Sequence, residues 1–171
     1  MPSDDTWSIE ALRKNHIRDR FDSGIPELDE FIQKYARQNE RLGLGRTFVA
    51  TRVNDTRVFG YFTLRTGEVR IERLPPAEAK RFPRYPVPVV HLARLAVDRA
   101  VQGQGLGELL LATALRKACV ASTEIASFAV EVIAINEQAK RFYMKFGFQE
   151  LLHNAQNLYL PMKTVRRLFE E

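Results

Sequence analysis

The stretch Leu92-Ala-Arg-Leu-Ala-Val-Asp98, followed after three residues by Gln102-Gly-Gln-Gly-Leu-Gly107, decides the fold of this chain. The apolar run that ends at Asp98 is typical of a buried strand, and the segment from Gly105 to Ala121 predicts a helix. Glycines between a strand and a helix let a ligand approach the backbone closely. The N-terminus of a helix adds partial positive charge and unpaired N–H groups. This stretch therefore predicts a phosphate-binding turn.

The spacing of the glycines excludes two common phosphate-binding loops. The loop of P-loop NTPases needs a lysine after its last glycine, but Glu108 follows Gly107 here. The dinucleotide fingerprint Gly-x-Gly-x-x-Gly, started at Gly103, needs a glycine where the chain has Glu108. The spacing is instead Gln-x-x-Gly-x-Gly, from Gln102 through Gly105 to Gly107. A structural turn without a ligand is the alternative interpretation.

Length and composition favour one intracellular domain with an anionic partner. The chain has 171 residues, 45% of them hydrophobic and 27% charged, so we expect one soluble domain over residues 1–171. The single cysteine, Cys119, suits a reducing compartment, which favours a cytoplasmic location. The net charge is +5, and most of the 26 basic residues are arginines, which bind phosphate well. Nucleic acid is one partner of this kind, and a solvated basic surface is the alternative.

The remaining chain alternates between predicted strands and helices, so the fold class is α/β. The order strand, glycine turn, helix, strand, helix, strand predicts a parallel crossover unit within a mixed sheet. Asn136 is the expected N-cap of the last of these helices, and Gly147 its C-terminal stop. The expected helices are Pro26–Gln38 (apolar face Leu28, Phe31, Ile32, Tyr35), Gly105–Ala121 and Asn136–Phe146, and the loop Leu74–Pro88 contains a helical turn at Ala77–Arg81. The expected strands are Arg46–Val53, Val58–Leu64, Val89–Val97, Phe128–Ile135 and, as one or two strands, Leu151–Leu160, with a hairpin turn at Asn54–Arg57.

The glycine motif, with its strand and helix, resembles the acetyl-CoA pyrophosphate loop of the GNAT acetyltransferases, and the similarity extends over about residues 20–160. The resemblance implies a GNAT fold, with splayed parallel strands in a central mixed β-sheet flanked by helices, and acetyl-CoA as cosubstrate without a metal. It implies that the backbone of Leu95, Ala96 and Val97 binds the pantetheine arm. Asn136 matches the family position that contacts the pantetheine or thioester end, a role compatible with capping. The pyrophosphate would lie on the backbone amides of Gln102, Gly103, Gln104, Gly105, Leu106 and Gly107.

Acetyl transfer from a thioester needs a group that protonates the departing thiolate. The candidate is Tyr143, in the motif Ala139-Lys-Arg-Phe-Tyr-Met-Lys-Phe-Gly-Phe148. A phenol has a pKa of about 10 and is protonated at neutral pH. Helical spacing alone is equally compatible with Tyr143 as a core aromatic residue. GNAT enzymes commonly place their general acid at this tyrosine, so the resemblance assigns the catalytic role to Tyr143.

The general base is left open by the sequence. Glu131, His91 and His153 are candidates, but none of them is expected to belong to an acid–base pair. An α-amine has a pKa of about 7.7–8.0 and is partly neutral without a base, whereas a lysine amine, at about 10.4, needs one. The lack of an evident base therefore favours an α-amine as the acceptor.

The chain resembles one GNAT branch in particular, the TacT/AtaT-like tRNA-acetylating toxins of type II toxin–antitoxin systems. The segments that carry this resemblance are Arg46-Thr-Phe-Val-Ala50, Pro88–Asp98 with its Arg94, the glycine motif and Ala139–Tyr143. The resemblance implies acetylation of the α-amine of aminoacyl-tRNA, which blocks translation. It also implies a homodimer, neutralised by a ribbon-helix-helix antitoxin, that reaches operator DNA only through the antitoxin complex.

The basic residues near these motifs are candidates for binding tRNA. They are Arg84, Arg94, Lys140, Arg141 and Lys145. Solvated surface charge is the alternative for each, and for Arg94 an internal ion pair. Two alternative functions also stay open, namely an acetyltransferase of protein N-termini or small-molecule amines, and a non-catalytic CoA-binding or DNA-associated module.

Overall fold

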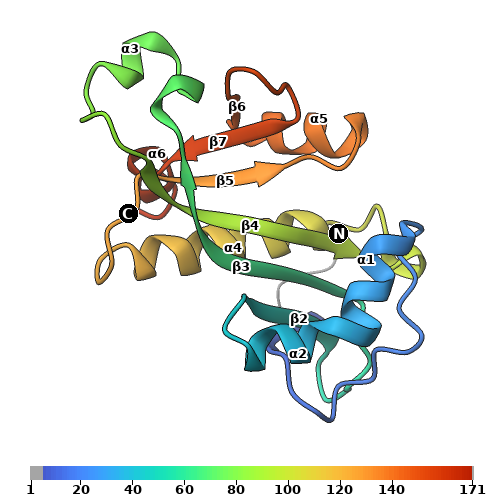
Figure 1. Ribbon diagram of the computed structural model, residues 1–171. Helices are drawn as coiled ribbons and strands as arrows, with labels where there is room; N and C mark the ends of the chain where they lie inside the picture. The colour runs from blue at the N-terminus through green and yellow to red at the C-terminus, as the bar shows by residue number, and fades with distance from the viewer. Residues whose placement is uncertain (1–5, 171) are drawn as a thin grey trace. The chain divides into compact units, whose positions relative to one another are not determined.

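A computed structural model describes residues 6–170 and confirms the α/β fold class. The strands of this part of the chain form one seven-stranded mixed sheet in the order β1-β2-β3-β4-β5-β7-β6 (Figure 1). The strands are β1 (Trp7–Ala11), β2 (Arg46–Arg52), β3 (Gly60–Val69), β4 (Val87–Val97), β5 (Ala129–Ile133), β6 (Gln149–Glu150) and β7 (Asn157–Pro161). The helices are α1 (Pro26–Glu30), η2 (Phe31–Tyr35), α2 (Ala36–Arg41), η3 (Ile71–Arg73), α3 (Pro76–Ala79), η4 (Arg99–Val101), α4 (Leu106–Ala121), α5 (Glu137–Lys145) and α6 (Met162–Leu168).

The described residues form two compact units. The first unit comprises residues 6–65 and Ala93–Ala114, and the second comprises Thr66–Leu92 and residues 115–170. β3, β4 and α4 each continue from one unit into the other. No helix in the described part of the chain is long and apolar enough to cross a membrane.

The first unit is built on an antiparallel meander. β1 pairs with β2 from Trp7↔Arg52 to Ala11↔Phe48, and β2 pairs with the first half of β3. The predicted hairpin turn at residues 54–57 joins β2 to β3. Asn54 has a φ of 64° there, a left-handed conformation that asparagine tolerates. The core includes Phe21, Phe31, Ile32, Val49 and Tyr61.

The helix predicted at Pro26–Gln38 forms, but a π-turn interrupts it between α1 and α2. The Ala36 N–H donates a hydrogen bond to the Phe31 carbonyl, five residues earlier. This wider turn brings Ala36 into the core, where it is fully buried, and leaves Tyr35 46% exposed. The predicted burial of Tyr35 is therefore wrong, whereas Leu28, Phe31 and Ile32 are buried as expected.

The second unit contains the predicted parallel pairing. β4 pairs in parallel with β5 from Val89↔Ala129 to Leu92↔Val132, and β5 pairs antiparallel with β7. β6 adds a short antiparallel strand to β7. The core that these strands share with the segment before β4 consists of Val69, Leu74, Val87, Val89, Ala129, Leu151 and Tyr159.

Several boundaries differ from the prediction. β3 begins at Gly60 rather than Val58, because the Val58 N–H donates to the Ile17 carbonyl and not to β2. The range Leu151–Leu160, predicted as one or two strands, contains a loop and the single strand β7, and the short strand β6 lies before it at Gln149–Glu150. β1 and α6 lie in segments that no motif covered and were not predicted.

Candidate functional site

The predicted phosphate-binding turn connects β4 to α4 within the first unit (Figure 1). The buried carboxylate of Asp98 accepts a hydrogen bond from the Asp22 N–H at 3.1 Å. The side-chain amide of Gln102 donates to the carbonyls of Val97 at 2.8 Å and Ser23 at 3.0 Å. The side chain of Gln102 therefore holds the loop in shape, and its backbone remains the part that can face a ligand.

The glycines of the turn shape the start of α4. Gly103 and Gly105 have φ angles of 77° and 89°, in the left-handed region that favours glycine. A Cβ atom on Gly103 would meet nothing within 4 Å, so this side of the loop is open. The first hydrogen bond of the helix runs from the Leu109 N–H to the Gly105 carbonyl, so the N–H groups of residues 106–108 lie ahead of it in the chain. These groups have no acceptor within the helix, so the turn fits the pyrophosphate of a nucleotide-like ligand.

A glycine on β3 supports the same region and was missed at the sequence level. A Cβ atom on Gly60 would lie 2.8 Å from Leu110 Cδ1 and 3.1 Å from Leu106 Cδ2, which are buried side chains of α4. A larger residue at position 60 would therefore force the Leu110 side chain, and to a lesser degree that of Leu106, to move away from the strand. An isolated glycine within a strand pattern signals such a close approach, so the sequence did contain the relevant signal.

The proposed pantetheine positions are the last three residues of β4. The register of β4 with β5 ends at Leu92, and Leu95–Val97 lie further along the strand, within the first unit. Ala96 is buried, whereas Leu95 and Val97 are half-buried. After Val97, the Asp98 N–H donates to the Phe59 carbonyl at 2.8 Å, which ties the end of the strand to the segment before β3.

Arg94 has no acidic partner among the described residues, so the internal ion pair considered for it does not form. Its guanidinium lies 3.6 Å from the centroid of the Phe31 ring, a cation–π contact. Burial lowers the pKa of Arg94 below its ordinary value, and the nearby charge of Arg65 lowers it further. An arginine keeps its charge under such conditions. Arg94 is thus a half-buried cation that a ligand anion could neutralise.

Tyr143 lies on α5 in the second unit and is buried. Its ring makes edge contacts with Phe142 at 5.3 Å and Phe148 at 5.5 Å between centroids. Its hydroxyl makes no hydrogen bond to any described residue. Burial raises the pKa of Tyr143 above its ordinary value, so the phenol stays protonated well beyond neutral pH. The ring is therefore a core aromatic, and the hydroxyl is a proton donor without a partner among residues 6–170.

Asn136 caps α5, as predicted. Its side-chain oxygen accepts a hydrogen bond from the Ala139 N–H at 2.8 Å, and its backbone is extended. The residue is exposed. Gly147, with a φ of 98°, follows the end of the helix in the left-handed conformation that such stops require.

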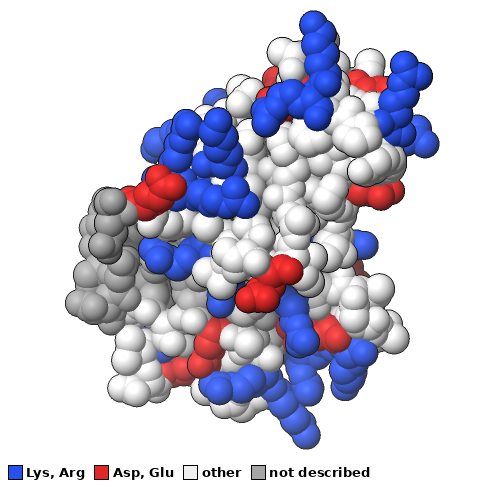
Figure 2. Space-filling view, turned by 90° about the vertical axis from the view of Figure 1, so that its left-hand side faces the viewer, with Lys and Arg blue, Asp and Glu red and all other residues white. Residues whose placement is uncertain are grey.

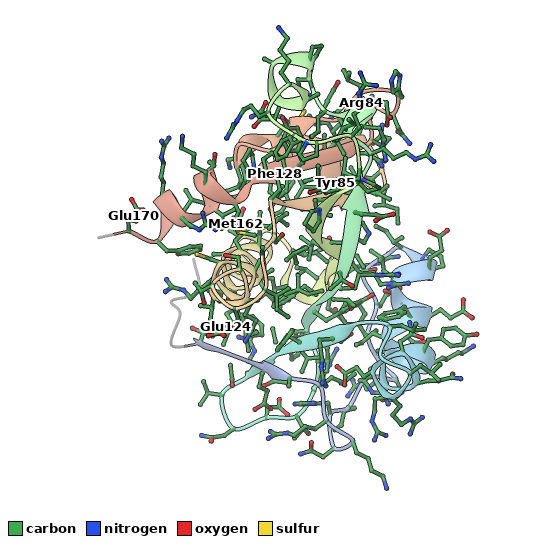
Figure 3. All side chains as sticks on the ribbon, turned by 60° about the vertical axis from the view of Figure 1, so that its left-hand side comes forward. Arg84, Tyr85, Glu124, Phe128, Met162 and Glu170 are labelled. Atoms are coloured by element: carbon green, nitrogen blue, oxygen red, sulfur yellow. The ribbon has the colours of Figure 1, made fainter. Side chains whose placement is uncertain are left out.

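The basic residues proposed for tRNA differ in their surroundings. Arg84 is exposed on the loop before β4, next to Tyr85 (Figure 3). Arg141 and Lys145 are exposed on α5 and form no ion pair with a described residue. Lys140 is engaged by Glu150 at 2.6 Å, and its side chain is only 12% exposed.

His91 and Glu131 form an acid–base pair. The expectation that neither residue belongs to such a pair is therefore wrong. They are register partners on β4 and β5, and His91 Nδ1 lies 3.0 Å from Glu131 Oε1. The two atoms lack the geometry of a directed hydrogen bond. Both side chains are largely buried. A neutral imidazole beside a carboxylate can accept a proton, so this pair is a candidate base. His153 is exposed with a φ of 73° and lies in the loop between β6 and β7.

The candidate residues thus divide between the two units. The first unit brings together Arg94, Leu95–Val97 and the loop from residue 102 to 107. The second unit contains Arg84, the His91–Glu131 pair and the α5 residues from Asn136 to Lys145. Among residues 6–170, no group of three or more His, Cys, Asp and Glu side chains could hold a metal ion.

Comparison with known proteins identifies one matching family and relatives that are named as toxins. The family "Acetyltransferase (GNAT) domain" matches residues 43–150. A "tRNA-acetylating toxin" from Mycobacterium tuberculosis (strain ATCC 25618 / H37Rv) is 39% identical over 148 residues, which cover 86% of this chain and 87% of that protein. A "Probable toxin TacT" from Sinorhizobium fredii (strain NBRC 101917 / NGR234) is 26% identical and covers 94% of this chain and 93% of its own.

Similar solved structures are also toxins of this kind or their complexes. The crystal structure of a tyrosine-to-phenylalanine mutant of KacT is 31% identical, with a TM-score of 0.92 over 96% of this chain and 99% of that one. AtaT complexed with acetyl-methionyl-tRNA is 32% identical, with a TM-score of 0.89 and the same coverage. AtaTR bound with AcCoA has a TM-score of 0.86 at 32% identity and covers 97% of this chain and 99% of that one. Further similar structures show AtaT bound to the C-terminus of the antitoxin AtaR and the AtaT–AtaR complex with DNA.

Proposed function

The chain belongs to the GNAT acetyltransferase family, and we propose that it is a toxin that transfers an acetyl group from acetyl-CoA to the α-amine of aminoacyl-tRNA. The observation that carries this proposal is the 39% identity to a tRNA-acetylating toxin over 86% of the chain. The similar AtaT structure with acetyl-methionyl-tRNA supports the same substrate class. Because β3, β4 and α4 continue through both units, we propose one catalytic domain over residues 1–171. We also propose that it acts in the cytoplasm, since charged tRNA is found there.

Acetyl-CoA supplies the acetyl group as an activated thioester, so the protein needs no covalent nucleophile. The loop from Gln102 to Gly107 would hold the pyrophosphate on its backbone N–H groups, because residues 106–108 have no helical acceptor. Leu95, Ala96 and Val97 would bind the pantetheine arm through their backbone. A backbone N–H of the same segment can polarise the acetyl carbonyl. Asn136 would contact the pantetheine or thioester end through the part of its amide that does not cap α5.

Tyr143 is the proposed general acid. Its hydroxyl keeps its proton because burial raises the pKa, and it has no hydrogen-bond partner among the described residues. The amine nitrogen bonds to the acetyl carbon, the carbon–sulfur bond breaks, and the phenol donates its proton to the departing CoA sulfur. The nitrogen then loses one proton to solvent, and solvent returns a proton to the phenolate. The amine must be neutral to attack. An α-amine with a pKa of about 7.7–8.0 meets that condition for a useful fraction of molecules near pH 7.

The proposed tRNA contacts are cations that form no ion pair with a described residue. Arg94 is half-buried without an acidic neighbour, and Arg84, Arg141 and Lys145 are exposed. Lys140 joins this set only when a phosphate competes with Glu150 for it.

The substrate class can be tested by tRNA binding. Replacing Arg84, Arg141 and Lys145 together by alanine should weaken tRNA binding and flatten its salt dependence by about 2 to 3 in the log–log slope, since each lost phosphate contact removes about 0.7–0.9. Acetyl-CoA affinity should not change. The matched control replaces Lys14, Arg20 and Arg41, which are also exposed and free of ion pairs to described residues. If the wild-type protein fails to bind tRNA at low salt and acetylates peptides or small amines instead, the tRNA proposal is wrong.

The partners follow the same resemblance. We propose a homodimer that is neutralised by a ribbon-helix-helix antitoxin and that reaches operator DNA only in complex with it. The similar structures of AtaT with AtaR, and of that complex with DNA, support this arrangement. A small ribbon-helix-helix gene that overlaps the gene of this protein would support it further. Expression with that gene should restore growth to cells that the toxin alone arrests.

A further inference from the structure

The second unit contains a pocket that none of the motifs predicted. Its volume is about 490 Å³, and it is lined by α3, by the residues before β5 and by α6. Phe128 and Met162 lie together in its wall (Figure 3), where the Met162 N–H donates to the Phe128 carbonyl at 2.7 Å. The hydroxyl-bearing residues Ser127 and Thr164 also line it. Its size is within the usual range for ligand sites.

The charge of this pocket is strongly positive. Four cations and one carboxylate line it. The carboxylate of Glu78 pairs with Arg81 at 2.7 Å. The other three cations, Lys163, Arg166 and Arg167, are exposed and form no ion pair with any described residue. Lysine and arginine side chains also gather on the face drawn in Figure 2, with fewer acidic ones between them.

Lys163 is a like-charged neighbour of both arginines of α6, although the last turn, where Arg166 and Arg167 lie, favours positive charge. Lys163 is three residues from Arg166 and four from Arg167, so its side chain neighbours each of the two arginines on the surface of α6. Like charges at this spacing repel one another and destabilise a helix. α6 has no acidic residue in its first turn to offset them. An anion with several charges would remove this repulsion.

We propose that this pocket, which we call the α6 pocket, binds phosphates of the tRNA backbone, as a contact additional to those of Arg84, Arg94, Arg141 and Lys145. This inference rests on the proposed function. The arginine fork pairs two of its N–H groups with phosphate oxygens, and the hydroxyl of Thr164 can donate to a third oxygen. RNA presents one phosphate for each nucleotide, so successive phosphates can neutralise neighbouring cations together. Phosphate contacts of this kind strengthen binding without reading sequence.

The test compares two triple variants with the same loss of charge. One replaces Lys163, Arg166 and Arg167 by alanine, and the other is the control with alanine at Lys14, Arg20 and Arg41. Alanine favours a helix and the replaced side chains are exposed, so the α6 variant should fold, and thermal unfolding checks this. In titrations with aminoacyl-tRNA, the α6 variant should lose about 2 to 3 from the log–log salt slope and bind about 10- to 100-fold more weakly at about 0.1 M salt. The control should keep the wild-type slope.

The same variants distinguish tRNA from other anions that could occupy the α6 pocket. An unchanged acetyl-CoA affinity in the α6 variant supports tRNA as the source, whereas a loss of acetyl-CoA affinity with normal tRNA binding overturns it. Binding of a polyglutamate peptide that depends on Lys163, Arg166 and Arg167, with tRNA affinity unchanged, would instead identify the pocket as a site for an acidic peptide and overturn the proposal. If the control variant binds tRNA as weakly as the α6 variant does, the loss of affinity comes from net charge alone, and the proposal is refuted. If wild type acetylates tRNA but the α6 variant binds it normally, this inference fails and the proposed function stands.

Discussion

The substitution Tyr143→Phe separates the two roles that the structure gives to this residue. The ring packs against Phe142 and Phe148, and phenylalanine keeps those contacts. The hydroxyl has no hydrogen-bond partner among the described residues, so its removal breaks no bond within that part of the protein. Only the transferable proton is lost.

The expected magnitudes for Tyr143→Phe differ strongly between stability and turnover. Because no hydrogen bond is lost, the free energy of unfolding should change by less than about 1 kcal/mol. Loss of a general acid typically lowers the rate by about 10²–10⁴-fold. That range corresponds to about 3–5 kcal/mol of transition-state stabilisation. The measurements are kcat with aminoacyl-tRNA, acetyl-CoA affinity by calorimetry, and urea unfolding.

A matched control is available in Tyr61. Its hydroxyl donates to the Leu28 carbonyl at 2.7 Å, and Tyr61 is a buried residue, as Tyr143 is. Tyr61→Phe should therefore destabilise the protein by about 1–2 kcal/mol and leave kcat for the folded enzyme near wild type. If Tyr143→Phe keeps full turnover, Tyr143 is only a core aromatic and the proton comes from another group. If Tyr143→Phe destabilises the protein as much as Tyr61→Phe is expected to do, the Tyr143 hydroxyl has a structural partner and the assignment of a free proton donor is wrong.

Three further predictions concern the loop, the phenols and the cap. Gly105→Asp should abolish acetyl-CoA binding in calorimetry. Gly43→Asp, at an exposed glycine whose φ is also positive, should carry similar backbone strain and bind acetyl-CoA normally. The free energy of unfolding should fall above about pH 10, by about 1.4 kcal/mol per pH unit for each of the buried phenols of Tyr61 and Tyr143. The cause is that these phenols ionise there in the unfolded chain, whereas burial keeps them protonated in the folded protein. Urea unfolding in that pH range should show a weaker pH dependence for Tyr143→Phe than for the wild type. Asn136→Ala should cost about 1 kcal/mol from the lost cap, and an unchanged free energy of unfolding would mean that the cap contributes little in solution.

The parts of the fold that depend on local sequence could be predicted. The glycine turn, the Asn136 cap and the Gly147 stop each depend on residues within a few positions, and each is present in the structure. The parallel pairing of β4 and β5 could also be predicted, because a strand–helix–strand order permits few topologies.

The parts that depend on pairing across the chain could not be predicted. His91 meets Glu131 only because the register of two strands sets them opposite each other, and no local pattern determines that register. The burial of Ala36 in place of Tyr35 follows from a π-turn, which helical spacing does not indicate. The cations of the α6 pocket belong to a segment without a motif, and only the fold brings them beside Arg81 and Phe128.

The central claim is that this protein acetylates the α-amine of aminoacyl-tRNA. The most direct measurement is mass spectrometry of the aminoacyl-adenosine released by nuclease from charged tRNA after incubation with acetyl-CoA and the purified protein. In the wild-type reaction we expect an aminoacyl-adenosine that is heavier by one acetyl group, with the acetyl on the α-amine, and with Tyr143→Phe we expect almost none. Charged tRNA that stays unmodified over a full set of amino acids, while a protein N-terminus or a small amine becomes acetylated, would contradict it.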